Sequence, residues 1–236
     1  MVTAAVLAGG SGTRMGAEIP KQFLEINSKS LLVRSIEAFV RNKNVDNIIV
    51  AVGEAFFEYT KQLIEEKVSA KKEIQVIVGG ATRSDTLYNV LEFMKEKGTL
   101  EGSIVLTHDA VRPFITDRII DDNIAAAEKY GACNTVVSAT DTILVSEDGQ
   151  FISAVPPRST VYHAQTPQSF NAKKLYELCN SLSDEVFSLL TDGCSVFTQC
   201  NEKVYLVRGE EYNIKITYPE DIKRAENIAA QYFDSK

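Results

Sequence analysis

The chain has 236 residues, of which 44% are hydrophobic and 24% are charged, and 25 Lys and Arg against 32 Asp and Glu give a formal net charge of −7. This length can bury a sizeable core without metal or disulfide staples, and the composition excludes wholesale disorder, a coiled coil and a collagen-like chain. The acidic balance excludes general nucleic-acid binding, which needs a basic footprint. With no run of about 20 apolar residues and no signal-peptide pattern, we expect a cytoplasmic protein without a membrane partner.

Short apolar runs alternate with helical patterns through the first half of the chain. Because strands that alternate with helices form right-handed βαβ units, this pattern predicts an α/β, Rossmann-like fold with a mostly parallel twisted sheet and helices on both faces. Ligands bind such sheets outside the carboxyl ends of the strands. The expected strands are 3–8, 48–52, 74–78 and 104–107, and the expected helices are 31–40, 56–68, 82–94 (with Thr82 as N-cap) and 117–130.

The second half of the chain begins with a hairpin pattern. Apolar runs at 142–145 and 151–155 flank Asp148-Gly149, and Asp-Gly is a strong signal for a hairpin turn. We therefore expect a β-arm over about residues 139–158 that projects from the α/β body. An isolated hairpin is marginally stable in water, so we expect the arm to pack on a second copy in a homodimer; the alternative is an arm folded back on its own domain. Strands at 204–207 and 213–217 and a helix from Pro219 complete a single domain spanning 1–236.

A glycine-rich segment at residues 7–16, LAGGSGTRMG, follows the first expected strand directly. Glycines let the backbone approach a phosphate closely, and successive N–H groups can bind an anion. The segment is neither a Walker A loop, which ends in Gly-Lys-Ser/Thr, nor a dinucleotide fingerprint, since Met15 replaces the third glycine. Arg14 and Lys21 add cations suited to a triphosphate. A tight strand–helix turn and a solvated surface lysine are the alternative interpretations.

Further polar segments lie where ligands are expected. Residues 79–85 follow the third strand, and their glycines and helix N-terminus could hold a base, sugar or phosphate. Asp109 follows the fourth strand and could contact Mg²⁺ or a ligand hydroxyl, because hard cations prefer carboxylate oxygen; the alternative is a pair with Arg112. We interpret the adjacent His108 as structural. Later polar or cationic residues beside apolar strands are Arg158, Thr166, Thr191 and Lys215.

Seven segments together carry a family resemblance: LAGGSGTRMG, PKQF, GGATRSD, THDAVRPF, TPQSF, LTDG and NIKITYPEDI, in order from Leu7 to Ile222. Through them the chain resembles the polyol-phosphate cytidylyltransferases, which include the D-ribitol-5-phosphate and the 2-C-methyl-D-erythritol 4-phosphate enzymes. The resemblance implies transfer of the cytidylyl group from CTP to a polyol phosphate with Mg²⁺ as cofactor. It also implies that the arm forms a homodimer.

The same resemblance implies roles for individual residues. Four cations match catalytic residues, the first two as transition-state stabilisers and the last two as residues that position the polyol phosphate: Arg14, Lys21, Arg158 and Lys215. Four residues match the surroundings of that second substrate: Asp109, Arg112, Thr166 and Thr191. Independently of the resemblance, its carboxylate makes Asp109 the candidate magnesium ligand. The residues expected to bind CTP are Leu7, Ala8, Gly9, Gly10, Gly80, Ala81, Thr82, Arg83, Ser84, Asp85 and Thr86.

Small features distinguish the two branches of the family. The segments 7–10, 107–114 and 190–194 are more similar to the ribitol branch, and Ala81 and Gly193 stand where the methylerythritol branch tends to have acidic residues. We therefore expect D-ribitol 5-phosphate as acceptor, with CDP-ribitol and pyrophosphate as products that serve teichoic acid or a related polymer. The alternative acceptor is 2-C-methyl-D-erythritol 4-phosphate of isoprenoid precursor biosynthesis. A sugar-phosphate nucleotidylyltransferase using another nucleotide, and a nucleotide-sensing subunit without turnover, also remain open.

The expected reaction needs no general base. A phosphate monoester has its second pKa near 6 and is largely dianionic at neutral pH, so its oxygen can attack the α-phosphorus directly. Catalysis then consists of positioning two anions and stabilising the charge that develops between them. Because Arg158 lies at the end of the expected arm, we expect the partner subunit to supply it.

Overall fold

The computed structural model describes residues 1–10 and 19–234, and Arg14 therefore lies outside the described residues. The strands are β1 (Val2–Ala8), β2 (Glu25–Ile26), β3 (Lys29–Ser30), β4 (Asn47–Val52), β5 (Ile74–Val78), β6 (Ile104–Asp109), β7 (Ala132–Ser138), β8 (Tyr162–Asn171) and β9 (Tyr205–Arg208). The α-helices are α1 (Leu31–Arg41), α2 (Phe57–Lys67), α3 (Arg83–Glu96), α4 (Asp117–Tyr130), α5 (Ala172–Ser181), α6 (Asp184–Leu189), α7 (Gly193–Gln199) and α8 (Glu220–Ile228). Short 3₁₀ turns are η2 (Lys21–Phe23), η3 (Glu54–Phe56) and η4 (Arg158–Thr160), and a π-helical turn, η5 (Ala229–Phe233), follows α8.

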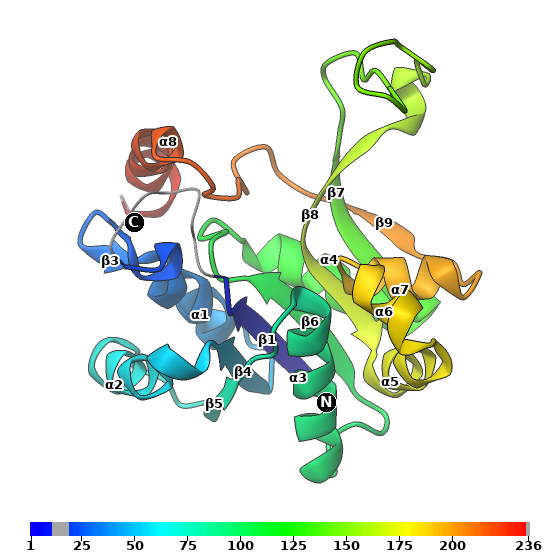
Figure 1. Ribbon diagram of the computed structural model, residues 1–236. Helices are drawn as coiled ribbons and strands as arrows, with labels where there is room; N and C mark the ends of the chain where they lie inside the picture. The colour runs from blue at the N-terminus through cyan, green and yellow to red at the C-terminus, as the bar shows by residue number, and fades with distance from the viewer. Residues whose placement is uncertain (11–18, 235–236) are drawn as a thin grey trace.

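In the described part of the chain, the main sheet has seven strands in the order β5-β4-β1-β6-β8-β7-β9 (Figure 1). β8 runs antiparallel to its neighbours β6 and β7, and the other neighbouring pairs are parallel. The sheet has helices on both faces, which confirms the predicted α/β, Rossmann-like fold. No helix among residues 1–10 and 19–234 is both long and apolar enough to cross a bilayer.

The two faces of the sheet are covered because its central strands are apolar on both sides. Side chains of a strand alternate between faces, so Ala4 and Val6 of β1 join one buried cluster while Ala5 joins the other. The first cluster is completed by α1, α2 and α4, and the second by α3, α5 and α7. This packing fixes the strand ends from which the loops of the site emerge.

The elements predicted in the first half of the chain are present with small shifts at their ends. Local chemistry sets these ends: the hydroxyl of Ser30 accepts a hydrogen bond from the Val33 N–H at the start of α1, and Thr116 caps α4 in the same way. Gly131 ends α4 with a φ of 83°, a conformation that favours glycine. Thr82 is the N-cap of α3, as predicted.

The arm differs from the predicted hairpin in having almost no strand. The segment between β7 and β8 projects from the body (Figure 1), and one isolated bridge, between Val145 and Ala154, joins its two sides. The predicted turn is present, because the Asp148 carboxylate accepts hydrogen bonds from the backbone N–H groups of Gln150 and Phe151, both at 2.9 Å. Two isolated strands have no third strand or helix to cover their apolar side chains, and pairing is weak without such a layer.

Two other predictions for the second half of the chain were wrong. Residues 213–217 are not a strand but an extended loop, fixed at Asn213 and Ile216, and Pro219 is the N-cap of α8 rather than its first residue. β8 was not predicted from the sequence. Its sequence, YHAQTPQSFN, lacks the apolar alternation of a strand because several of its buried side chains are polar and satisfied by hydrogen bonds.

Candidate active site

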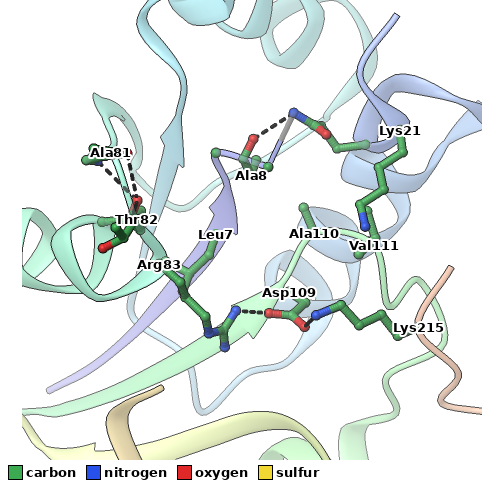
Figure 2. A pocket seen from close by; sticks show the side chains of 15 residues that line it. Leu7, Ala8, Lys21, Ala81, Thr82, Arg83, Asp109, Ala110, Val111 and Lys215 are labelled. Carbon is green, nitrogen blue, oxygen red and sulfur yellow. Dashed lines mark hydrogen bonds and ion pairs between the residues drawn. The ribbon is translucent and has the colours of Figure 1, made fainter. Parts of the chain in front are cut away.

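A cleft of about 420 Å³ lies at the carboxyl ends of β1, β5 and β6 (Figure 2), where ligands bind open α/β sheets. Its walls come from the end of β1, the turn η2, the N-terminus of α3, the end of β6 and the loop before α8. The lining residues are Leu7, Ala8, Gly9, Gly10, Lys21, Gln22, Gly80, Ala81, Thr82, Arg83, Thr86, Asp109, Ala110, Val111 and Lys215. The size is within the range of small-molecule sites.

Asp109 organises the charges of this cleft. One carboxylate oxygen pairs with Arg83, and the other lies 2.9 Å from Nζ of Lys215 and 3.8 Å from Nε of Arg112. Arg83 and Lys215 approach from opposite sides (Figure 2). Burial by itself raises the pKa of Asp109, but the Arg83 and Lys215 cations outweigh it and hold the pKa well below its usual range. The described lining residues include three cations, Lys21, Arg83 and Lys215, and one carboxylate, Asp109, so the charge of this lining is positive.

The start of α3 brings backbone groups to the cleft. A capping box forms it: the Thr82 hydroxyl accepts the Asp85 N–H at 3.1 Å, and the Asp85 carboxylate accepts the Thr82 N–H at 2.9 Å. The Gly80 N–H donates to Oγ1 of Thr86 at 3.1 Å. A Cβ on Gly80 would lie 2.7 Å from the carbonyl carbon of Asp85, so this close approach requires glycine.

The turn η2 presents Lys21 to the cleft. The Gln22 amide donates a 2.7 Å hydrogen bond to the carbonyl oxygen of Ala8, which ties the turn to the end of β1. Phe23 is buried against Phe56 and Tyr59, with ring centroids 5.4 Å and 4.9 Å away. These contacts fix the backbone of Lys21, whose side chain runs toward Val111 in Figure 2.

Lys215 is held by the two buried residues that flank it. The Asn213 carbonyl oxygen accepts a 2.8 Å hydrogen bond from Arg112, and the Ile216 N–H donates to the Val111 carbonyl oxygen at 2.9 Å. Asn213 and Ile216 are fully buried, whereas the Lys215 side chain is 40% exposed. The irregular loop therefore delivers its cation to the cleft at a fixed point.

The structure brings most of the predicted CTP-binding residues together with Lys21, Asp109 and Lys215. Ser84 and Asp85 do not line the cleft; the Ser84 hydroxyl donates to the Leu190 carbonyl oxygen at 2.6 Å, and Asp85 caps the helix. Thr191 is exposed ahead of α7, outside the lining of the cleft.

Three other predicted residues lie away from the cleft surface. Arg158 is exposed on the arm, where its guanidinium donates to the Thr142 hydroxyl at 3.3 Å. Arg112 and Thr166 are buried beneath the cleft floor. In place of these, the structure adds Gln22, Ala110 and Val111 to the lining. The sequence placed them inside the PKQF and THDAVRPF segments, but only the tertiary contacts show that they face the cleft.

The described residues show no preformed cluster of metal-ligating side chains. They contain no group of three His, Cys, Asp or Glu side chains that could hold a metal, and both oxygens of Asp109 are engaged by cations. Direct ligation of Mg²⁺ by Asp109 stays a prediction.

Comparison with known proteins identifies the family. Residues 2–231 match the profile of the 2-C-methyl-D-erythritol 4-phosphate cytidylyltransferase (IspD) family. The solved 4-diphosphocytidyl-2C-methyl-D-erythritol synthase from Anaerococcus prevotii is 29% identical, with a TM-score of 0.83 over 98% of this chain and 96% of that chain. The 2-C-methyl-D-erythritol 4-phosphate cytidylyltransferase from Francisella tularensis is 26% identical (TM-score 0.76, covering 95% and 97%), and that from Thermus thermophilus is 25% identical (TM-score 0.70, covering 96% and 98%). The chain belongs to this IspD family and is a cytidylyltransferase.

Proposed function

We propose that the chain transfers the cytidylyl group of CTP to 2-C-methyl-D-erythritol 4-phosphate and releases pyrophosphate. The observation that carries this proposal is the convergence of Lys21, Arg83 and Lys215 on one cleft of an acidic chain. Two highly negative substrates need such a local positive site. The family profile and the similar solved structures support methylerythritol phosphate as the acceptor. They favour it over ribitol 5-phosphate, the acceptor expected from the sequence.

The chemistry is an in-line displacement at the α-phosphorus of CTP. An oxygen of the acceptor phosphate forms the new P–O bond, the bond between the α-phosphorus and the bridging oxygen of the β-phosphate breaks, and pyrophosphate leaves with that electron pair. The attacking phosphate is already dianionic, so no proton has to be removed. The chain contributes cations that neutralise the charge building up on the α-phosphate and the leaving group.

The cleft divides between the two substrates along Asp109. The glycines after β1, the N-terminus of α3 and Lys21 suit the triphosphate, because backbone N–H groups and a cation there meet phosphate oxygens. Lys215, on the opposite side of Asp109 from Arg83, suits the acceptor phosphate. CTP enters with Mg²⁺ on its own phosphate oxygens, as part of the substrate, since Mg²⁺ is commonly bound through substrate phosphates.

Ribitol 5-phosphate is the second candidate acceptor, and the presence of an alanine at position 81 favours it. Ala81 lines the cleft where methylerythritol enzymes tend to have an acidic residue, so this chain lacks a carboxylate there. Gly193 carries less weight, because a Cβ at this position would lie 2.7 Å from the ring of Phe170 and packing alone explains the glycine.

We further propose a homodimer formed through the arm. Leu144, Phe151, Ile152 and Val155 are 55%, 75%, 61% and 56% exposed, a concentration of apolar surface that a second copy would bury. Arg158 stands at the end of the same segment and is exposed. A partner's arm laid over the cleft would supply this cation to the acceptor phosphate.

A pyrophosphate-release assay with CTP and each acceptor tests the function. We expect kcat/KM for methylerythritol phosphate to exceed that for ribitol 5-phosphate at least about tenfold, a difference of roughly 1.4 kcal/mol in transition-state binding. The reverse order would assign ribitol 5-phosphate. Turnover with neither acceptor, or equal turnover with CTP and UTP, would overturn the proposal.

A further inference from the structure

A chain of buried hydrogen bonds runs beneath the cleft floor and ends at the backbone of Asp109. Nε2 of His108 lies 3.0 Å from the carbonyl oxygen of Arg112, and Nδ1 lies 3.1 Å from Oγ1 of Thr166. The N–H of Asp109 donates to the same Thr166 hydroxyl oxygen at 3.1 Å. His108 is fully buried and Thr166 is 4% exposed, so solvent does not compete for these bonds.

The partners and the burial of the His108 ring fix the direction of each hydrogen bond in this buried series. A carbonyl oxygen only accepts, so Nε2 of His108 must carry the proton. The ring is fully buried, and its two nitrogens meet a carbonyl oxygen and a hydroxyl oxygen rather than a carboxylate, so the ring is neutral and Nδ1 has a free lone pair. The Thr166 hydroxyl therefore donates to Nδ1 and accepts from the Asp109 N–H. Its one proton is committed within the protein and is not directed at a ligand.

The surroundings of the His108 ring leave it little freedom to turn. Phe39 packs against it edge-on, with centroids 5.3 Å apart and an angle of 74°. The charged groups that act on it are Asp109, Arg112 and Arg83. Directly after Asp109, the Ala110 carbonyl oxygen accepts a 2.9 Å hydrogen bond from the Ser35 hydroxyl of α1. The end of β6 that carries Asp109 and the turn after it are thus held by hydrogen bonds from β8 and α1.

We propose that His108 and Thr166 are positioning residues for the Asp109 carboxylate. As the Nε2–H tautomer, His108 orients the Thr166 hydroxyl, and that hydroxyl fixes the Asp109 backbone so that its carboxylate sits between Arg83 and Lys215. Thr166 then acts from beneath the site rather than by touching substrate. The kinetic consequence of this inference rests on the proposed function, whereas the tautomer does not.

Nitrogen NMR of the imidazole rings tests the tautomer directly. The chain has two histidines, and His163 is exposed, so a His163→Gln variant leaves one ring to observe. At pH 7 we expect a protonated Nε2 and an unprotonated Nδ1 for His108. A protonated Nδ1, in the other tautomer or in an imidazolium, would overturn the inference whatever the acceptor turns out to be.

Thr166→Val and Thr166→Ser separate positioning from folding. Valine keeps the shape and removes the hydroxyl; serine keeps the hydroxyl. We expect Thr166→Val to lower kcat roughly tenfold, the scale of one lost hydrogen bond, and Thr166→Ser to restore it. Unchanged kcat in a folded Thr166→Val protein would refute the positioning role. If the wild type turns over no polyol phosphate, the proposed function fails, and the NMR result still decides the tautomer. If Thr166→Val does not fold, the NMR result and the kcat of Thr166→Ser decide the positioning role.

Discussion

The Asp109 carboxylate joins Lys215, at 2.9 Å, to Arg83, which pairs with its other oxygen. One acidic side chain thus orients two cations that come from α3 and from the loop before α8. Without substrates, the carboxylate offsets part of the positive charge of the two cations and holds them in a defined geometry. Phosphate groups entering the cleft would meet cations already in place, which is the arrangement that lowers the reorganisation cost of a reaction between anions.

Replacing Lys21 tests its role in the charge stabilisation. We expect Lys21→Ala to lower kcat by about two to three orders of magnitude, as the loss of a preorganised charge donor does. The fold should remain, because Gln22 and Phe23 anchor the turn. Steady-state pyrophosphate release measures the effect, with Lys203→Ala, an exposed lysine outside the cleft, as the control. Near-wild-type turnover would remove Lys21 from the mechanism.

Lys215 should matter most for the acceptor. We expect Lys215→Ala to raise the KM for the polyol phosphate by about tenfold or more, the scale of a lost charge-assisted hydrogen bond, with a smaller change in the KM for CTP. Lys215→Arg, which keeps the charge, should be less impaired. Initial rates with each substrate varied in turn give both constants. An effect confined to CTP would exchange the two subsites.

Gly80 should be needed for the geometry of the α3 N-terminus. An alanine there would press its Cβ against Asp85 and disturb the capping box, and we expect a loss of about 1–3 kcal/mol in the free energy of unfolding. Gly53→Ala is the matched control: Gly53 has a φ of −61° and nothing within 4 Å of an added Cβ. Urea denaturation compares the two. Equal stabilities would show that α3 shifts without cost to admit the methyl group.

The buried His108 should make stability depend on pH. Burial lowers its pKa to about 4, against about 6.5 in an unfolded chain, so between these values the unfolded state binds more protons. Its contribution to the free energy of unfolding is therefore complete above about pH 6.5 and falls by about 3 kcal/mol as the pH drops to about 4. Denaturation curves of the wild type and His108→Gln across this range measure the difference. Parallel pH profiles would contradict it.

Mixed dimers test whether Arg158 acts across the subunit boundary. An Arg158→Ala chain and a Lys215→Ala chain, when co-expressed, can form a heterodimer. If Arg158 acts across the boundary, one site of that heterodimer has Lys215 from the first chain and Arg158 from the second. If Arg158 acts in trans, the mixture should recover about a quarter of wild-type activity, because half of the dimers are mixed and each has one intact site. Activity no greater than that of the two variants measured separately would place Arg158 in its own subunit's site or outside the reaction.

Local signals sufficed for the sheet core and the loops that line the cleft, but not for the polar layer beneath the cleft. The apolar runs of β1 and β4 and the Thr82 cap are readable one segment at a time. β8 is not, because Gln165 and Thr166 are buried only by virtue of their partners on other segments. Whether Thr166 faces the cleft or supports it from below is likewise a tertiary fact. The same holds for the arm, whose strands would need a covering surface to form.

A ³¹P NMR time course of the wild-type protein with Mg²⁺, CTP and 2-C-methyl-D-erythritol 4-phosphate tests the proposed reaction most directly. We expect the phosphomonoester signal of the acceptor to disappear in step with CTP, while a diphosphate diester and pyrophosphate grow in equal amounts. Release of CDP with inorganic phosphate, or of CMP with the acceptor signal unchanged, would contradict attack by the acceptor phosphate at the α-phosphorus.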